Sequence, residues 1–292
     1  MTAPTIARTT ATRPRPVRAI RARPAAWLVW GLVIFFFVNL AGVIGSVVVS
    51  SFGERWFDTW LPQGWTGRWY GEAWRDFGLL PVLVTTVEVS LSVVAISVLV
   101  GVPASYVLAR RSFPGRRLLY LLFLLPILMP PITYGIPLAT VLYKYGFAGH
   151  FSGVVLANLV PSVPFVILTM TPFIEQIDPA IERAARMCGA GTGRIFTRIL
   201  APLLVPGMLA ASILVLVRTV GMFELTFLTA GPDSTTLVVA LYNSMSAAGI
   251  RAQQSVDAMA VIYTGTMLVL LVLALRVVNP TQLVARVKEE PE

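Results

Sequence analysis

The chain has 292 residues, of which 56% are hydrophobic and 13% charged, and its formal net charge at pH 7 is +9. A mean hydropathy of +0.77, concentrated in long uncharged runs, excludes an ordinary soluble domain and indicates a polytopic membrane protein. The basic residues stand in short clusters beside apolar runs, as membrane topology requires, which argues against nucleic-acid binding. One cysteine, Cys188, and one histidine, His150, leave no basis for an intramolecular disulfide or a metal site.

The N-terminal region consists of a basic tail, an apolar run and a tryptophan-rich segment. Residues 1–24 carry arginines among prolines and threonines, which predicts a disordered cytoplasmic tail. The run 25–49 is longer than the apolar part of a signal peptide and lacks a convincing cleavage site, so we expect it to stay as the first span. The segment that follows, up to residue 79, contains Trp56, Trp60, Trp65, Trp69 and Trp74. We expect an external interfacial hairpin there, or a docking surface for an external partner.

Apolar runs of the length that a bilayer demands recur along the chain. A hydrocarbon core about 30 Å thick requires about 20 apolar residues per helix. The stretches that qualify are about 25–49, 80–108, 118–143, 153–175, 201–230 and 256–278. The third is the least regular, since the run Leu-Pro-Ile-Leu-Met-Pro-Pro over 125–131 predicts a kink. The sequence therefore predicts an all-α membrane protein with six transmembrane helices.

The arginine clusters determine the expected orientation, because cytoplasmic loops carry an excess of Lys and Arg. With a cytoplasmic N-terminus, most of the 23 basic residues fall in the two tails and in the loops 109–117 and 176–200. We therefore expect both termini in the cytoplasm. The domain boundaries that follow are a first span with its external segment over 25–79, a core of five helices over 80–278 that includes the loop 176–200, and a cytoplasmic tail over 279–292.

The loop 176–200 is a polar, arginine-bearing island between two apolar spans. Asp178-Pro179, an acceptor followed by a first-turn proline, predicts the start of a short helix. Glycines at 189, 191 and 193 then end that helix and allow a sharp turn. A second short basic helix is expected to meet the membrane at Pro202. No strand precedes these glycines and no Gly-Lys-Ser/Thr follows, so they form no phosphate-binding loop, and energy must come from another chain or from an ion gradient.

This loop resembles the EAA loop of bacterial binding-protein-dependent ABC-importer permeases, whose pattern is E-A-A, three residues, G, nine residues and I-x-L-P. The residues at matching positions are Ala184, Ala185, Gly189, Ile199 and Pro202. Arg183 stands where the family has glutamate, and Ala201 stands where it has leucine. Glu182 offers an acid one residue earlier, displaced by about 100° around a helix. The loop 109–117 also resembles the family's short basic turn between these spans.

The resemblance implies the type I (MetI-like) permease fold in a bacterial inner membrane. It also implies a second permease half, identical or related, two ATPase subunits that use ATP-Mg, and an external solute-binding protein. By this resemblance the chain itself binds no cofactor and is not an enzyme, and its loop 181–202 docks into the ATPase. The residues expected to contribute to that coupling are Glu182, Arg183, Ala184, Ala185, Arg186, Gly189, Ala190, Arg194, Ile199 and Pro202.

Ionisable groups inside membrane spans are functional candidates, because placing them in lipid is expensive. Glu88 lies in the second expected span, and Arg218 and Glu224 lie in the fifth. Residues six positions apart cannot simply pair on one helix, so each of the latter two needs another partner or a watery cavity. Polar side chains can line the same route, although they also join membrane helices to one another. The residues expected to line a solute pathway are Glu88, Tyr134, Asn158, Arg218, Thr219 and Glu224.

The sequence leaves the solute open. The pattern Gly-Pro, then Thr-Leu, then Leu-Tyr over 231–242 resembles the polyamine, ferric-ion and phosphonate branch of the family more than the sugar branch. Glu88 and Glu224 favour a polyamine-like solute, whereas Arg218 favours an anion such as a phosphonate; a ferric ion or a sugar is also compatible. The alternative function is a secondary transporter driven by protons or sodium, for which no inverted repeat is visible.

Overall fold

The computed structural model describes residues 24–56, 61–246 and 252–277. The expected tails, apart from residue 24 at the start of the first helix, and Trp60 lie outside the described residues. The chain divides into two compact units, Met1–Ser46 and Val47–Glu292. The described residues of the first unit, 24–46, all lie in helix α1 (Pro24–Phe52). Residues 47–52 of this helix belong to the second unit.

Helix α1 is apolar on every side. Its segment Ala26–Phe52 has a mean hydropathy of 2.6, and bulky side chains such as Trp27, Trp30 and Phe35 are exposed. A helix of this length without a polar face has no favourable position in water and is suited to span a bilayer. The first expected span is thereby confirmed as a helix.

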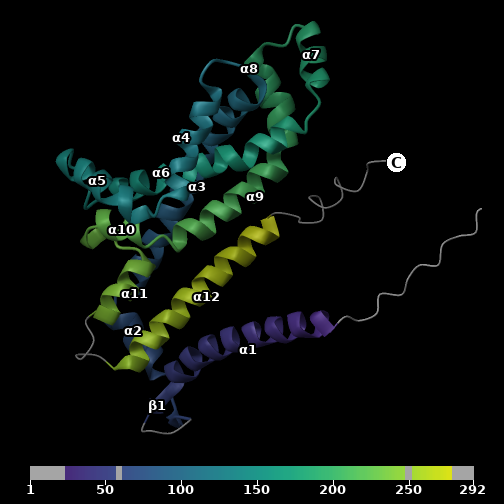
Figure 1. The fold of residues 1–292 in the computed structure, drawn as a ribbon. Coiled ribbons are helices and arrows are strands. Elements are labelled where there is room, and N and C mark those ends of the chain that lie inside the picture. The colour runs from purple at the N-terminus through teal and green to yellow at the C-terminus, as the bar shows by residue number, and fades with distance from the viewer. Residues whose placement is uncertain (1–23, 57–60, 247–251, 278–292) are drawn as a thin grey trace, which may run out of the picture. The chain divides into compact units, whose positions relative to one another are not determined.

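The second unit is almost entirely helical (Figure 1). After the end of α1 come two short strands, β1 (Gly53–Arg55) and β2 (Gln63–Trp65), which pair antiparallel with Gly53 opposite Trp65. The further elements are α2 (Arg68–Asp76), α3 (Leu79–Arg110), α4 (Arg116–Leu128), α5 (Pro131–Lys144), α6 (Phe151–Glu175), α7 (Pro179–Met187), α8 (Thr192–Ile195), a π-helical turn (Phe196–Leu200), α9 (Ala201–Val220), α10 (Glu224–Thr229), a 3-10 turn (Pro232–Ser234), α11 (Leu237–Ser246) and α12 (Gln253–Val277).

The tryptophan-rich segment does form a hairpin, followed by the amphipathic helix α2. Trp69 on α2 is buried, and its indole Nε1–H donates to Gly53 O at 2.7 Å, which holds α2 against the start of the hairpin. In contrast, Trp56, Trp65 and Trp74 are exposed. The interfacial position of the exposed rings stays a prediction.

The core of the second unit lies where α3 packs against α6 and α9 (Figure 1). Fully buried apolar side chains from all three helices meet there, among them Val93, Val166 and Ala211. At Gly101 a Cβ atom would lie 2.7 Å from Val166 Cγ1, so the absence of a side chain allows α3 and α6 to approach closely. Membrane helices associate through such close packing, because lipid is as apolar as the side chains themselves.

The third expected span is broken, as its prolines predict. Helices α4 and α5 meet at an angle of 99°, with the break at Met129 and Pro130. Pro130 and Pro131 have no N–H to continue the hydrogen-bond ladder of α4, whereas a proline in the first turn of α5 loses nothing. The described residues hold 5 helices long and apolar enough to cross a membrane, or 6 if the bent pair is one span.

The boundaries expected for the fifth span, 201–230, are wrong at both ends. One continuous helical run covers Thr192–Val220, so the expected basic helix is not separate from the span. A π-helical turn covers Phe196–Leu200, and in it the Ala201 amide donates to Phe196 O. This turn accommodates Pro202, which has no N–H and which would crowd the carbonyl four residues earlier in a regular α-helix. At the other end the helix stops at Val220, and α10 forms a separate short helix.

Candidate functional site

Helix α7 forms the first half of the loop that the sequence singles out, and both of its ends are well defined. At its start, Asp178 Oδ1 accepts a hydrogen bond from the Ala180 amide at 2.8 Å, which caps the helix next to Pro179. At its end, Gly189 has a φ of +79°, the Ala190 amide donates to Ala185 O at 3.0 Å and the Gly189 amide donates to Arg186 O at 3.0 Å. This pair of bonds is the Schellman motif, which requires a left-handed residue at the position of Gly189.

Glu182, the acid of α7, is turned toward the protein interior and is only 3% exposed. Its Oε1 forms an ion pair with Arg110 Nε at 2.8 Å, and its Oε2 accepts a hydrogen bond from the Tyr106 hydroxyl at 2.9 Å. Arg186, one turn further along α7, pairs with the same Oε2 at 3.4 Å. A buried carboxylate is stable in such a place only because cationic and hydroxyl groups surround it.

Two residues of this cluster, Tyr106 and Arg110, were not among the sequence-predicted site residues. Both lie in the last turns of α3, and Tyr106 is 76 residues away from Glu182 along the chain. Arg110 also donates from Nη2 to Ile177 O at 2.5 Å, in the link between α6 and α7. The only sequence signal was that Arg110 belongs to a basic turn at a helix end, where a cation is favourable in any case.

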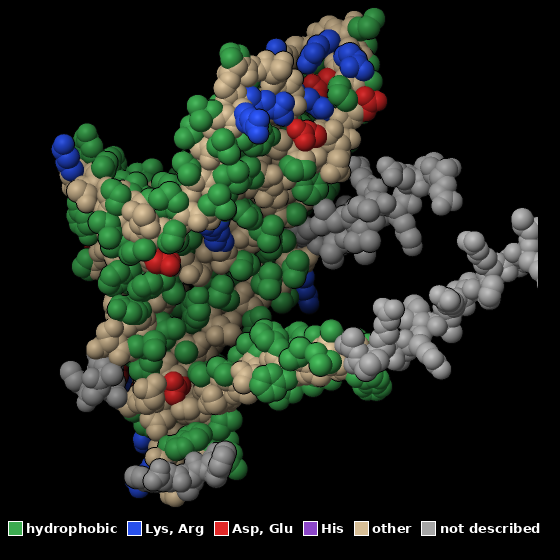
Figure 2. All heavy atoms as spheres, in the orientation of Figure 1, with side chains coloured by type: hydrophobic (Ala, Val, Ile, Leu, Met, Phe, Trp, Pro, Cys, Tyr) green, Lys and Arg blue, Asp and Glu red, His purple; other side chains and the backbone are tan. Residues whose placement is uncertain are grey.

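The remaining predicted coupling residues divide by exposure. Exposed positions are Arg183, Ala184, Arg186, Gly189, Arg194 and Pro202, while Ala185, Ala190 and Ile199 are half-buried. The start of the following helix is attached to the core through the fully buried Ile195 and through Phe196, whose ring meets that of Tyr106 edge-on at 5.5 Å. Figure 2 shows many Lys and Arg side chains where α7 and α8 lie, with a few Asp and Glu side chains among them. The result is a basic surface on a firmly held scaffold.

Three of the expected pathway residues come together at the break between α9 and α10. Arg218, in the last turn of α9, and Glu224, at the start of α10, both lie within Coulombic range of the Tyr134 hydroxyl on α5. The Arg218 guanidinium lies 5.7 Å from the ring centre of Phe165 on α6. Neither Arg218 nor Glu224 forms an ion pair with any described residue. The break thus places two opposite charges within electrostatic range of one buried hydroxyl.

The other expected pathway residues have different surroundings. Asn158 on α6 is buried, and its Nδ2 donates to Thr226 Oγ1 at 3.2 Å, so it joins α6 to α10. Asn158 Oδ1, Thr219 Oγ1 and the Tyr134 hydroxyl are buried without a hydrogen-bond partner among the described residues. Glu88 is exposed on α3, and within the described part of the chain it has no hydrogen bond or ion pair. The structure does not bring Glu88 into contact with the other five.

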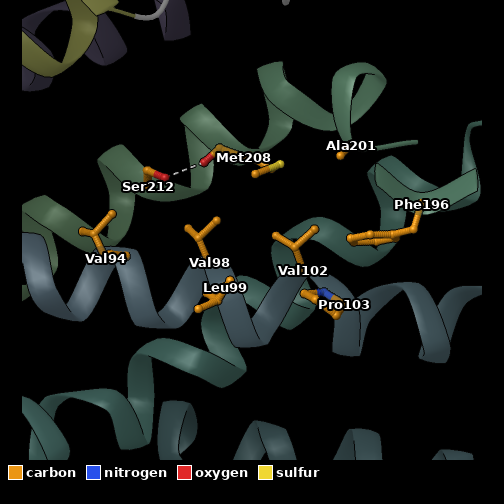
Figure 3. A pocket seen from close by; sticks show the side chains of 10 residues that line it. Val94, Val98, Leu99, Val102, Pro103, Phe196, Ala201, Met208 and Ser212 are labelled. Carbon is orange, nitrogen blue, oxygen red and sulfur yellow. Dashed lines mark hydrogen bonds between the residues drawn. The ribbon is translucent and has the colours of Figure 1, made fainter. Parts of the chain in front are cut away.

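An apolar groove of about 340 Å³ lies between α3 and α9 (Figure 3). Val94, Val98 and Val102 face Met208 across it, and Phe196 closes one end. The hydroxyl of Ser212 in its lining already donates to Met208 O at 2.7 Å. A groove with this lining offers a polar solute no recognition. Among the described residues there is also no group of three His, Cys, Asp or Glu side chains placed to hold a metal ion.

Comparison with known proteins extends these observations. Residues 101–282, more than half of the chain, match the family model of the "Binding-protein-dependent transport system inner membrane component". The chain is 31% identical over 153 residues to the diacetylchitobiose uptake system permease protein NgcG of Streptomyces coelicolor, an alignment that covers 52% of this chain and 51% of that protein. It is 32% identical over 183 residues to the molybdenum transport system permease protein ModB of Escherichia coli, covering 56% and 80%. A probable sulfate transport system permease protein cysT of Nephroselmis olivacea is 34% identical over 234 residues, covering 74% and 77%.

Solved structures agree on the fold. A bacterial ABC transporter involved in the import of the acidic polysaccharide alginate superposes with a TM-score of 0.70 at 17% identity, covering 89% of this chain and 98% of that chain. The first of the curated relatives match the chain over only about half of their own length. The family match and the packing of the apolar helices nevertheless agree with each other and with the resemblance of residues 183–202 to the EAA loop. The chain therefore belongs to the binding-protein-dependent transport system inner membrane components, and it has their type I, MetI-like permease fold.

Proposed function

We propose that this chain is one transmembrane subunit of an ATP-driven, binding-protein-dependent importer, and that residues 181–202 couple it to a separate ATPase subunit. The observation that carries the proposal is the construction of α7. Its start is capped by Asp178, its end is closed by Gly189, and its acid is tied to α3, so that its arginine-bearing face is held rigidly toward the outside of the subunit. A helix that must transmit movement to a membrane bundle needs such a firm connection.

The proposed complex contains a second permease subunit, identical or homologous, two ATPase subunits that use ATP-Mg, and an external solute-binding protein. The alginate transporter of the same fold has been solved with a periplasmic protein bound to an alginate pentasaccharide, which supports the last of these partners. The arginine distribution supports an orientation with both termini and α7 in the cytoplasm. In this arrangement closure of the ATPase pair pulls on α7 and, through it, on α3.

The proposed solute is a small polar molecule that passes the break between α9 and α10. The names of the relatives include diacetylchitobiose, trehalose, sulfate and molybdenum, and none of those we compared includes a polyamine. Arg218, which favours an anion, and Glu224, which favours a polyamine, both lie within electrostatic range of Tyr134, so the charges at the break favour neither solute class. A polyamine-like solute stays a prediction, beside a sugar, an oxyanion, a phosphonate or a ferric ion.

The experiment that tests this function is reconstitution of the chain in proteoliposomes with its ATPase and its solute-binding protein. ATP hydrolysis is measured while a disaccharide, molybdate, sulfate and a polyamine are supplied in turn, each with and without the binding protein. We expect one solute class to stimulate hydrolysis and to accumulate in the vesicles only when the binding protein is present. Accumulation by this chain alone, driven by a proton or sodium gradient, would instead establish the secondary transporter.

A further inference from the structure

Helix α7 carries one acid, Glu182, which is buried, and two arginines, Arg183 and Arg186, which are exposed. Both carboxylate oxygens of Glu182 are occupied within the subunit, Oε1 by Arg110 and Oε2 by Tyr106 and Arg186. The Glu182 side chain is 4% exposed, and that of Arg110 is 12% exposed. A carboxylate that is buried and already paired in this way is not available to a second protein.

Arg183 follows Glu182 directly and is therefore turned by about 100° around the helix. It is exposed and forms no ion pair with any described residue. It also occupies the position at which the EAA pattern of the family has glutamate. At this position, therefore, the surface offers a guanidinium to a docking protein and not a carboxylate.

The surroundings of Arg183 reinforce this positive charge. Arg186 is half exposed, and Arg194 and Arg198 on the following helical run are exposed and unpaired among the described residues. Within α7 the only acidic residue is the buried Glu182, and the adjacent Asp178 is engaged in capping the helix. Met187, which is 90% exposed, adds one apolar group to this arginine face.

We propose, on the basis of the proposed coupling function, that Glu182 is a positioning residue that fixes α7 to α3, and that the ATPase subunit of this importer receives α7 in an acidic groove that pairs with Arg183. The partner is identified by charge complementarity: a groove that accepts an exposed guanidinium flanked by further arginines must present carboxylates. Movement of α7 is passed to α3 through the contacts that Glu182 makes with Arg110 and Tyr106.

The first test concerns the groove. The complex is purified through a tag on this chain, and the Arg183→Lys variant is treated with a carbodiimide, which joins an amine only to a carboxylate in direct contact. We expect the introduced amine to be joined to an Asp or Glu of the ATPase. Arg117→Lys is the matched control, because Arg117 is exposed and unpaired among the described residues but lies on α4. Retention of the ATPase without any such cross-link from position 183 would overturn the acidic groove.

Charge reversal gives a second readout of the same interface. We expect Arg183→Glu to retain the ATPase at least about tenfold less well than the wild type, because like charges facing one another across an interface are strongly unfavourable. Arg117→Glu should retain it normally. Wild-type retention by Arg183→Glu would contradict the proposal. A wild-type chain that copurifies with no ATPase at all would refute the proposed function itself, which is a different outcome.

The test of Glu182 separates positioning from binding. We expect Glu182→Gln to keep the ATPase bound, since Arg183 is untouched, but to transport roughly tenfold less solute per ATP hydrolysed, because a buried ion pair is broken. Tyr106→Phe removes only one hydroxyl, so this variant should fold normally and show the same change more weakly. The double variant Arg110→Glu with Glu182→Arg should recover part of the lost solute transport per ATP hydrolysed. Release of the ATPase by Glu182→Gln, with retention by Arg183→Glu, would show that Glu182 and not Arg183 meets the partner.

Discussion

Gly189 provides the most direct test of the closed end of α7. A Cβ built on this residue meets no atom of this chain within 4 Å, so within the subunit any effect of Gly189→Ala arises from the backbone. The residue has a φ of +79°, and the left-handed conformation is unfavourable for an L-residue by about 1–2 kcal/mol. That free energy lowers the population of the correctly closed helix end by about 5- to 30-fold relative to competing conformations. Asparagine tolerates this conformation better, so Gly189→Asn should lose less.

The assay is ATPase retention and solute transport by the reconstituted complex, together with the yield of membrane-inserted chain. We expect Gly189→Ala to insert normally and to lose coupled transport, with Gly189→Asn in between. Gly193→Ala is the matched control, because Gly193 lies in α8, has no positive φ, and also has open space around its Cβ position. Equal transport by Gly189→Ala and Gly193→Ala would refute the role that we assign to the turn.

Three further predictions concern the scaffold. Replacing Asp178 by alanine removes the cap of α7 and should destabilise it by about 1 kcal/mol, seen as faster hydrogen exchange of the first α7 amides; unchanged exchange would show that the cap is dispensable. Gly101→Ala places a Cβ 2.7 Å from Val166 Cγ1 and should destabilise the bundle by about 1–3 kcal/mol, measured as a lower Tm in detergent. Combining it with Val166→Ala should restore the Tm. A double variant with no higher Tm than Gly101→Ala would contradict the steric explanation. The buried Leu237 amide donates to Thr86 Oγ1 at 2.8 Å. Thr86→Val removes this acceptor and should lower the free energy of unfolding by about 1–3 kcal/mol, whereas Thr86→Ser should behave as the wild type. Equal Tm values for both variants would argue against a contribution of this bond.

Features that depend on short stretches of sequence could be predicted. The first, second, fourth and sixth expected spans agree with α1, α3, α6 and α12, because an unbroken apolar run needs no long-range information to become a membrane helix. The break at Pro130 and Pro131 follows from the missing N–H groups, and the end of α7 at Gly189 follows from the need for a positive φ.

The boundaries of the fifth span illustrate where this reasoning stops. Pro202 and the basic residues before it suggested a separate helix, but a π-helical turn carries the helix from Thr192 through to Val220. The break before Glu224 gave no equally strong signal, since Gly221 alone does not decide between a continued and an interrupted helix. Local propensity is weak at such places, and packing against α5 and α6 decides the outcome.

By itself, the sequence determined the membrane class, the spans, the arginine-rich loop and its family motif, because each of these is written in neighbouring residues. Only the tertiary structure decided which way the charges of α7 point. Glu182 and Arg183 are adjacent in sequence, yet one is paired inside the subunit with Arg110 and Tyr106 of α3 and the other is exposed. The direction of a side chain on a short helix depends on how that helix is set against a distant one, and that relation appears only once the chain has folded.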